Sequence, residues 1–490
     1  MNRCVPAFVR TTARAAAYDG AWVRARARAH STHPACGTDD VYDVVIVGGG
    51  LVGAALACAL TRVASSTSST SLLPRVALID ESTLPPLHHH APFANRVYSV
   101  TPASAAFLQA IGAWSHLRPL RVCRYTAMHV WDAVAHGALH FESPHAAAKP
   151  IAYVIENLNL QHALSKCLNH TPHGSVHVFN PASVGSIMRQ GGDHGWPQVT
   201  IKNGPTLTTR LLIGADGAKS SVRHFANIDS VSLDYNQRGI VATLQVDTSV
   251  SSGRIDNTSA WQRFLPVGPV ALLPLDEKHC SLVWSLSADL AKRVSLLSDQ
   301  DFITILNAAL LNPYHDVEFL SLQIDNNGKP LVDFTQEAEW GRQRASRSRN
   351  APTPPLVVGV QQGSRAAFPL KLSHAAKYIG DRVALVGDAA HTVHPLAGQG
   401  LNLGLSDVST LAAVIQTGIE SGQDIGSVIL LEEYAKDAYA RNAVMSAALH
   451  AIQRLFGTDM SVVSWLRSVG MNSLNAIVPL KDVFMKVAGS

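Results

Sequence analysis

The feature that most constrains the fold of this chain is a glycine-rich turn near residue 50. Residues 42–47 read Tyr-Asp-Val-Val-Ile-Val, an apolar and β-branched run typical of a buried parallel strand. Gly48 allows a tight turn directly after this run, and Gly50 lets the backbone approach a pyrophosphate. Gly53 then lets the next helix, expected over 51–63, pack on the strand. The pattern predicts a Rossmann-type α/β fold that binds a dinucleotide.

The first helical residues and a downstream acid complete this predicted nucleotide site. Leu51 and Val52 begin the helix, so their amides and the positive end of the helix dipole point at the phosphates. A second apolar run, 76–79, ends at Asp80, whose carboxylate can accept hydrogen bonds from ribose hydroxyls. Asp80 comes about 10 residues later than this motif requires, and the Ser/Thr-rich stretch 64–73 accounts for the excess as an inserted loop. The turn alone does not distinguish NAD from FAD.

A second glycine-bearing stretch, far along the chain, decides between NAD and FAD. A buried-strand pattern over 381–386 ends at Gly387 and Asp388, and Asp388 can bond ribityl hydroxyls. A loop containing Gly398 then opens a helix expected over 401–415. The backbone amides of Gly400, Leu401 and Asn402 can point at the pyrimidine edge of a flavin, where negative charge develops on reduction. Two distant nucleotide-contacting stretches hold one long cofactor at both ends, which indicates FAD.

The segments between these stretches predict the rest of the architecture. An apolar strand ends at Gly214-Ala215-Asp216-Gly217, which places Asp216 and Gly217 at the carboxyl edge of a sheet, where open α/β sheets bind ligands. Alternation and aromatic residues over 239–284 predict an antiparallel sheet, and we expect the part between Trp261 and Trp284 to cover the substrate. The fold class expected is α/β: a Rossmann-type FAD-binding domain, an inserted antiparallel β-sheet substrate domain and a C-terminal helical region.

Composition excludes several other classes. The chain has 490 residues, of which 47% are hydrophobic and 16% charged, as in globular proteins. A net charge of +4 does not argue for nucleic acid, and no apolar run reaches the 18 or so residues that span a bilayer. The six cysteines are scattered without a CxxC pair, which favours a reducing compartment. We expect no metal site, because His88–His90 and the pair His391 and His394 lack further ligands at coordinating spacing.

Residues 1–36 differ in composition from the body of the chain. They hold arginines among alanines, with no lysine and with Asp19 as the single acid. This composition is typical of a mitochondrial transit peptide, while a basic disordered tail and a chloroplast address are the alternatives. The domain boundaries expected are 1–36 transit peptide, 41–235 first part of the FAD-binding domain with some substrate-side strands, 236–343 substrate β-sheet, 344–356 linker, 357–420 second part of the FAD-binding domain, and 421–490 C-terminal helical region.

These motifs together resemble one family, the class A flavoprotein monooxygenases of the para-hydroxybenzoate hydroxylase type. The three cofactor motifs occur in its order, and the segment from His394 through Gly398-Gln399-Gly400 to Asp407 resembles the signature of the ubiquinone-biosynthesis hydroxylase branch. Further segments agree: Asn95-Arg96-Val97, Val130-Trp131-Asp132, Tyr153 to Asn157, Ala260-Trp261-Gln262-Arg263-Phe264, Leu466-Arg467 and Pro479-Leu480-Lys481. The likeness runs from about residue 41 to the C-terminus. The Val130-Trp131-Asp132 element, together with the N-terminal leader, looks most like the mitochondrial hydroxylase that acts at ring carbon C5 of a polyprenyl phenol.

The resemblance implies an activity and a set of cofactor residues. FAD would activate O2 as a flavin C4a-hydroperoxide, which passes one oxygen atom to the ring of a polyprenylated phenol. Relatives often carry an arginine after the Glu-Asn pair where this chain has Leu158, so Arg96 and Gln161 are the candidates for phosphate contact there. The stretch from Pro395 to Asn402 is expected to form a wall against the flavin. No catalytic side chain is assigned.

Partners and location follow from the same resemblance. The expected electron donor is a ferredoxin with its reductase, NAD(P)H being the alternative, and other ubiquinone-biosynthesis proteins are expected partners. A polyprenyl substrate dissolves in the bilayer, so we expect peripheral contact with the matrix side of the mitochondrial inner membrane. The apolar stretch 444–487 can supply that contact or can simply pack on the body. A prenyl reductase or epoxidase of the same fold, and a non-catalytic prenyl-lipid carrier or assembly scaffold, are the rival functions.

Overall fold

The apolar run 42–47 forms a central strand of a mainly parallel sheet, as its sequence predicts. The computed structural model describes residues 40–63, 74–88, 91–135, 137–143, 150–171, 175–192, 194–247, 257–345, 353–394, 398–458 and 460–476. The predicted leader, the loop 64–73 and the residues 395–397 lie outside these ranges. The chain divides after Val41 into two units, and its helices and strands from Tyr42 onward belong to the second.

Sheet 1 carries the predicted nucleotide strands. Its order is β18 (Ile379–Gly380), β19 (Val383–Leu385), β11 (Thr206–Gly214), β1 (Val41–Val47), β2 (Val76–Ile79) and β8 (Val176–Phe179), with β10 (Pro197–Ile201) and β9 (Val184–Arg189) continuing from β11. Strands β1, β2 and β8 run parallel, as do β11 and β19. The residues of β2 are fully buried, as expected for the β-branched and apolar run 76–79.

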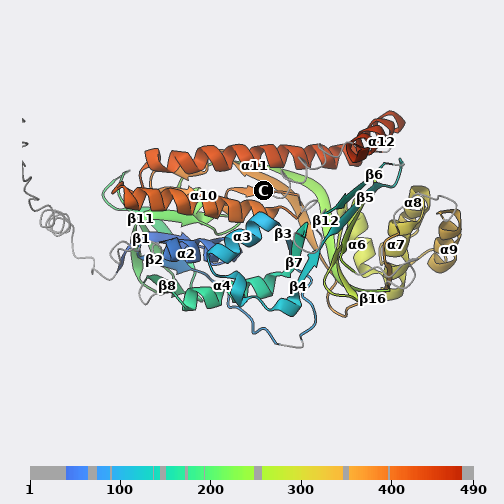
Figure 1. Cartoon of the computed structure of the whole chain (residues 1–490), viewed down its shortest axis with the longest axis horizontal. Coiled ribbons are helices and arrows are strands. Elements are labelled where there is room, and N and C mark those ends of the chain that lie inside the picture. The colour runs from blue at the N-terminus through green and yellow to red at the C-terminus, as the bar shows by residue number, and fades with distance from the viewer. Residues whose placement is uncertain are drawn as a thin grey trace, which may run out of the picture. The chain divides into compact units, whose positions relative to one another are not determined.

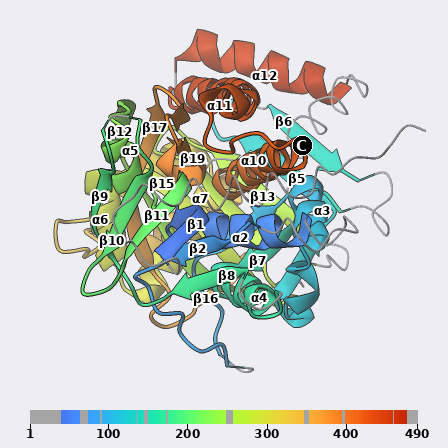
Figure 2. The same ribbon diagram turned by 90° about the vertical axis from the view of Figure 1, so that its left-hand side faces the viewer.

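Helices α2 (Leu51–Val63), α4 (Asn157–Asn169) and α10 (Gly400–Glu420) pack beside sheet 1, and α3 (Pro102–Ala110) contacts α10 (Figures 1 and 2). Helix α2 occupies the range that the sequence predicts, and α10 extends the predicted helix at both ends. The two helices approach closely at Gly404, where an added Cβ would lie 2.7 Å from Val52 Cγ2. Small residues therefore bring the two helices together beside the strand ends.

Sheet 2 is assembled from three separate parts of the chain. Its order is β20 (His391–Thr392), β17 (Ala366–Ala375), β12 (Ser230–Asp247), β15 (His279–Ser287), β14 (Val270–Pro274), β13 (Ser259–Phe264), β5 (Ala127–Asp132) and β6 (Ala138–Glu142), with β16 (Leu356–Val360) beside β12. The antiparallel pairing expected over 239–284 is confirmed, while β13 and β5 run parallel. Strands β16 and β17 fall in the range 357–420 that we assigned from sequence to the FAD-binding domain, yet they pair with β12. The domain boundaries stay predictions.

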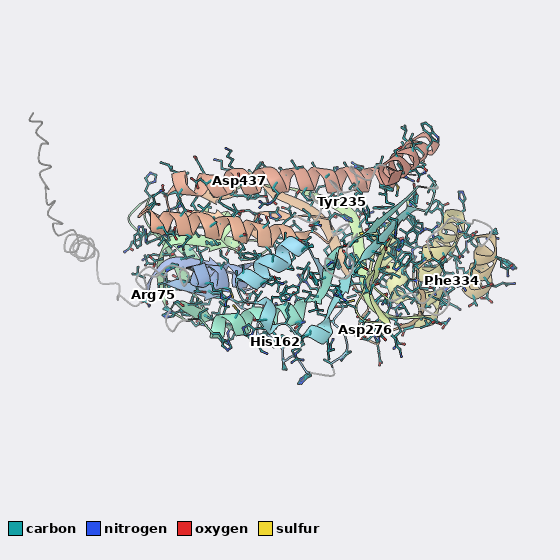
Figure 3. The ribbon with its side chains drawn as sticks, viewed as in Figure 1. Arg75, His162, Tyr235, Asp276, Phe334 and Asp437 are labelled. Atoms are coloured by element: carbon teal, nitrogen blue, oxygen red, sulfur yellow. The ribbon has the colours of Figure 1, made fainter. Side chains whose placement is uncertain are left out.

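The two faces of sheet 2 have different neighbours. Trp261 and Trp284 lie on the face that packs against α6 (Ala288–Leu296), α7 (Asp299–Leu311), α8 (Tyr314–Leu322) and α9 (Phe334–Ala345). These helices gather at the right of Figure 1, and Phe334, labelled in Figure 3, lies among them. The alternate residues of the same strands, including Gln262 and Val283, face a cavity. The two tryptophans themselves therefore point away from the predicted substrate side.

A small sheet and two long helices complete the described part. Sheet 3 joins β3 (Val97–Val100), β7 (Ala152–Glu156) and β4 (Val122–Tyr125), and short helical turns span Trp114–His116, Pro119–Arg121, Gly387–Ala389 and, as α5, Ser221–Phe225. Helix α11 (Val428–Phe456) packs along α10, and the Tyr235 hydroxyl lies 3.1 Å from His450 Nδ1 of α11 (Figure 3). Helix α12 (Ser461–Ala476) packs on β6.

A buried ion pair attaches α12 to sheet 2. The Arg467 guanidinium donates to both carboxylate oxygens of Asp132 at the end of β5, with Nη2 3.0 Å from Oδ1. Its Nη1 donates to the carbonyls of Leu455 and Thr458, each at 2.9 Å. Both charged side chains are 1% exposed. One guanidinium thus joins β5, the end of α11 and α12.

We predict that Arg467→Met lowers the free energy of unfolding by about 3–5 kcal/mol, because it leaves the Asp132 carboxylate buried without its partner. Urea unfolding followed by circular dichroism measures this loss. Arg454→Met, at an exposed position of α11, is the control and should change stability by less than about 0.5 kcal/mol. Adding Asp132→Asn to Arg467→Met should restore part of the lost stability. Equal stability of Arg467→Met and Arg454→Met would contradict the prediction.

Candidate functional site

The two glycine stretches that the sequence analysis paired open onto the same cavity. This cavity has a volume of about 1990 Å³ and is lined by Gly50, Leu51 and Val52 at one element and by Gly398 to Leu401 at the other. Ligand pockets for one small molecule usually measure about 300–1,000 Å³. The cavity therefore has room for a dinucleotide together with a second molecule.

Each of the three glycines of the first turn is explained by a different feature of the structure. Gly48 has a φ of +101°, and a Cβ there would collide with the backbone of Ala215, while a Cβ on Gly53 would collide with the carbonyl of Gly48. A Cβ on Gly50 would meet nothing within 4 Å, although Gly50 lines the cavity. Gly48 and Gly53 therefore allow the fold, whereas the bare backbone of Gly50 leaves space for a ligand. This is the fit that the phosphates of FAD require at the N-terminus of α2.

Asp80 lies beside the turn, at the end of β2, as predicted. An added Cβ on Gly49 would lie 2.6 Å from Asp80 Cβ, so the carboxylate and the turn are in direct contact. Partial burial raises the pKa of Asp80, while the backbone amides of Ser82, Gly49 and Glu81 lower it in part. Its position suits a ribose contact, which stays a prediction.

Asp216 is placed differently from the simple expectation of a side chain directed into the site. Its Oδ2 accepts hydrogen bonds from Ser221 N at 2.6 Å, Ser221 Oγ at 2.8 Å and Val222 N at 3.3 Å, at the start of α5. Its neighbours Ala215 and Gly217 line the cavity, whereas Oδ1 is buried without a hydrogen-bond partner in the described part of the chain. One carboxylate oxygen therefore holds the turn, and the other remains for a ligand.

Asp388 lines the cavity at the end of β19, where the sequence predicts it. Surrounding protein desolvates the carboxylate and raises its pKa, and the nearby His391 and Arg96 offset this in part. Its carboxylate has no hydrogen-bond partner among the described residues. The Asp388 side chain is nevertheless exposed toward the cavity, and an acid without a protein partner in this position is a candidate ligand contact.

Arg96 and Gln161, the two candidates for phosphate contact, also line the cavity. The Arg96 guanidinium lies 5.8 Å from the ring centre of Tyr98, another lining residue. Asn157 Nδ2 donates to Gln161 Oε1 at 3.0 Å, which leaves the amide hydrogens of Gln161 for other partners. A cation and an amide therefore line the cavity, and their contact with the phosphates stays a prediction.

The start of α10 is the second segment that the sequence predicts to contact the cofactor. Gly398 has a φ of +61°, and Gly398, Gln399, Gly400 and Leu401 line the cavity. The Asn402 side chain turns away: its Oδ1 accepts from Thr101 N at 3.0 Å, and its Nδ2 donates to the Ser99 carbonyl at 2.8 Å. Asn402 thus fixes the start of α10 against β3 and α3. Pro395, also predicted in the site, lies outside the described residues.

Asp407 supports the site in a way that the sequence analysis missed. This fully buried carboxylate accepts hydrogen bonds from Gly387 N at 3.1 Å, His391 Nε2 at 2.6 Å, Arg441 Nη2 at 3.1 Å and Asn442 Nδ2 at 2.8 Å. It therefore links the Gly387-Asp388 turn to α10 and α11. An acid two turns inside an apolar helix was the available signal, because such a group must find buried donors.

Comparison with known proteins settles the family. The model of the "FAD binding domain" family matches residues 41–337 and 331–447. The mitochondrial ubiquinone biosynthesis monooxygenase COQ6 of Xenopus tropicalis is 38% identical over 94% of each chain, and that of Homo sapiens is 37% identical over 92% of this chain and 93% of its own. The chain belongs to the FAD-binding domain family. It is an FAD-dependent monooxygenase, and its relatives place it in the ubiquinone-biosynthesis branch that its motifs resemble.

Solved structures show the same fold at low sequence identity. The p-nitrophenol 4-monooxygenase PnpA of Pseudomonas putida is 17% identical, covers 92% of this chain and 99% of its own, and has a TM-score of 0.64. PqsL of Pseudomonas aeruginosa, described as a probable FAD-dependent monooxygenase, is 19% identical, covers 88% of this chain and 100% of its own, and has a TM-score of 0.61. The predicted fold class and FAD as the cofactor are confirmed. The relatives named mitochondrial support a mitochondrial protein.

We predict that Asp388→Ala weakens FAD binding on the order of 10- to 100-fold, because it removes an acceptor for charge-assisted hydrogen bonds. The apoprotein should unfold at the same urea concentration as wild-type apoprotein, since no described residue loses a hydrogen bond. Flavin titration of the apoprotein measures the affinity. Asp437→Ala, at an exposed position of α11 (Figure 3), is the control, and full FAD occupancy in Asp388→Ala would contradict the assigned role.

Proposed function

We propose that this monooxygenase hydroxylates ring carbon C5 of a polyprenylated phenol in ubiquinone (coenzyme Q) biosynthesis. The observation that carries the proposal is that the cavity continues from the FAD-binding elements into an apolar lobe. That lobe is lined by residues of β5, β6, β13, α11 and α12: Met128, Val130, Leu139, Phe141, Phe264, Ile452, Leu455, Phe456, Leu466 and Met471. Relatives named ubiquinone biosynthesis monooxygenases support the choice of pathway.

The lobe suits an isoprenoid chain for a simple physical reason. Burying apolar surface releases about 25 cal/mol per Å², so each isoprene unit adds to binding when it leaves water for an apolar wall. A small phenol without a tail would leave the lobe filled with water. The substrate expected is therefore one aromatic ring near the flavin with its prenyl tail in the lobe.

FAD, when bound, supplies the activation of O2 that allows one oxygen atom to be transferred to an electron-rich ring. The chain's own residues bind, orient and shield. The N-terminus of α2 at Gly50 would hold the phosphates, and Asp388 would accept hydrogen bonds from the ribityl chain. The amides at Gly400 and Leu401 favour negative charge on the flavin ring. The apolar lobe would exclude water from the place where oxygen is transferred, which limits side reactions.

The electron donor belongs to the same proposal. We infer a ferredoxin with its reductase as the donor, with NAD(P)H as the alternative. The sequence contains one glycine fingerprint, which FAD would take, and this supports a donor protein over a second bound dinucleotide. Other proteins of ubiquinone biosynthesis are proposed partners.

We expect the FAD-loaded enzyme, given a short-chain prenylated phenol and labelled ¹⁸O2, to place one ¹⁸O atom on the ring at C5. Parallel reactions reduced by ferredoxin with its reductase and by NADPH identify the donor, and mass spectrometry with NMR of the product gives the position. A product with two added hydrogens and no ¹⁸O would support the prenyl reductase alternative. Label on the prenyl chain would support an epoxidase. A protein that holds no FAD would support a scaffold.

We also propose peripheral contact with the matrix side of the mitochondrial inner membrane through α12 and the end of α11. Met460, Trp465 and Leu466 are 64%, 63% and 56% exposed. Leu455 and Leu466 are exposed and also line the cavity, so the apolar surface is continuous with the lobe. These helices also pack inward through Arg467 and Met471, as the alternative for the C-terminal stretch predicts. No helix in the described ranges is long and apolar enough to cross a bilayer.

Trp465→Ser should weaken binding to vesicles of phosphatidylcholine and cardiolipin by about tenfold, because the indole loses its apolar contact with the lipid. Co-sedimentation over a range of lipid concentrations measures the change. Trp340→Ser on α9, where the indole is 46% exposed, is the matched control and should bind as the wild type does. Unchanged binding of Trp465→Ser, or an equal loss in both variants, would remove α12 from the contact.

A further inference from the structure

Gln262, in the middle of β13, is a buried polar residue that no assigned role explains. The residue is 6% exposed and lines the cavity. Its side-chain amide has no hydrogen-bond partner among the described residues. The next residue, Arg263, points to the opposite face, where its guanidinium donates to the carbonyls of Ala309 at 2.9 Å and Asn312 at 2.8 Å. The strand therefore gives its outward guanidinium two carbonyl acceptors, although Arg263 Nε has no partner among the described residues, and leaves the inward amide without any.

The surroundings of Gln262 on the cavity face are apolar. The register of sheet 2 places Val130 of β5 and Ala271 of β14 directly opposite Gln262, on either side. Residues directly opposite each other point to the same face, as do residues two apart on one strand, so Phe264 flanks Gln262 as well. A buried amide among such neighbours is costly unless a ligand or water completes its hydrogen bonds.

The small side chain of Ala271 leaves room beside this amide. Val283 of β15 stands directly across from Ala271, so the row of Gln262, Ala271 and Val283 has a polar end, a shallow middle and an apolar end. A flat ring fits over the shallow middle with one edge at the amide. Phe264 and Val130 also belong to the apolar cluster that lines the lobe, so a tail on the ring can continue into it.

The chemistry of an amide narrows the ligand group. A glutamine side chain offers one acceptor and two donors, so it pairs with a hydroxyl group and equally with an ionised phenolate, without adding charge to an apolar wall. An isoprenoid tail has no group that such an amide can recognise. Of the proposed substrate, the oxygen-bearing edge of the ring is the part that matches.

We propose that the Gln262 side chain binds the oxygen substituent of the substrate ring and thereby fixes which ring carbon faces the flavin. This inference rests on the proposed function, because it takes a prenylated phenol as the ligand. Gln262 acts as a specificity-determining residue: it discriminates rings by their oxygen substituent, while the apolar lobe binds the tail without regard to the ring.

The test compares two ligands on the FAD-loaded, oxidised enzyme by the change in flavin absorbance on binding. One ligand is a short-chain prenylated phenol, and the other is the same prenylated ring without its hydroxyl group. Wild-type enzyme should bind the phenol about three- to tenfold more tightly, as one net hydrogen bond implies. In Gln262→Met this preference should fall to about one, because the phenol loses affinity while the deoxy ligand keeps its own.

Matched variants separate recognition from folding. Gln262→Met loses no protein partner, so its melting temperature and FAD content should equal or exceed those of the wild type, and Gln262→Leu provides a second variant of the same kind. Leu273→Met changes the same cavity wall without removing a polar group and should keep the wild-type preference. If both Gln262 variants keep the wild-type preference for the phenol over the deoxy ligand, the role of Gln262 is overturned, while the proposed function is not affected. Binding of neither ligand by the wild type would overturn the proposed substrate class itself.

Discussion

The site depends on backbone segments that approach one another more closely than side chains would permit. At the carboxyl ends of β1, β11 and β19, Ala215 N donates to the Val47 carbonyl at 2.8 Å and Val386 N donates to the Gly214 carbonyl at 3.0 Å. Gly53 then lets α2 pack on the Gly48 turn, and Gly404 lets α10 pack against the Val52 side chain of α2. Both helices consequently begin beside the same cavity with their positive ends toward it. A long ligand with negative charge at two places is what this arrangement favours, and FAD is such a ligand.

The buried carboxylate of Asp407 keeps the Gly387 turn and the start of α10 in place. A charge in the interior is stable only when donors surround it, and here four donors come from the turn at Gly387, from His391 and from α11. The fixed position of Gly387 means that the adjacent Asp388 needs no hydrogen bond of its own to stay at the cavity wall. The fold thus satisfies one acid completely and leaves the next one, Asp388, at the cavity wall without a hydrogen-bond partner among the described residues.

The sequence predicts the parts of this site that follow from local rules. Strand periodicity, the glycines of the first turn and an acid at a strand end depend on a few neighbouring residues, and the structure places Gly50, Asp80 and Asp388 accordingly. The choice among hydrogen-bond partners is not local. The Gly-Ala-Asp-Gly motif does not indicate that Asp216 accepts hydrogen bonds from the first amides of α5. The sequence around Asn402 likewise does not indicate that its amide bonds to Ser99 and Thr101.

The same limit applies to sheet 2. Strands β16 and β17 lie next to the second FAD stretch in sequence, but their partner β12 lies more than a hundred residues earlier. The face on which Trp261 and Trp284 lie depends on this register, because a shift of one residue reverses every side chain. The sequence of β13 does not mark the inward face, because Ser259 and Arg263 alternate with Trp261 on one side while Gln262 alternates with Ala260 and Phe264 on the other.

The apolar lobe and the polar part of the cavity meet different requirements of ligand binding, and sheet 2 connects the two parts. An apolar lobe binds a long tail tightly but discriminates poorly, because one methylene group changes binding by only about 1–3 kcal/mol. Discrimination among ring positions therefore has to come from polar groups held rigidly. Strand β5 provides that rigidity: Val130 faces the lobe opposite Gln262, and Asp132, two residues further, holds Arg467 of α12. Because the wall of the lobe is fixed by a buried ion pair, α12 can leave Trp465 and Leu466 exposed at its surface without loosening the chamber in which the ring is held.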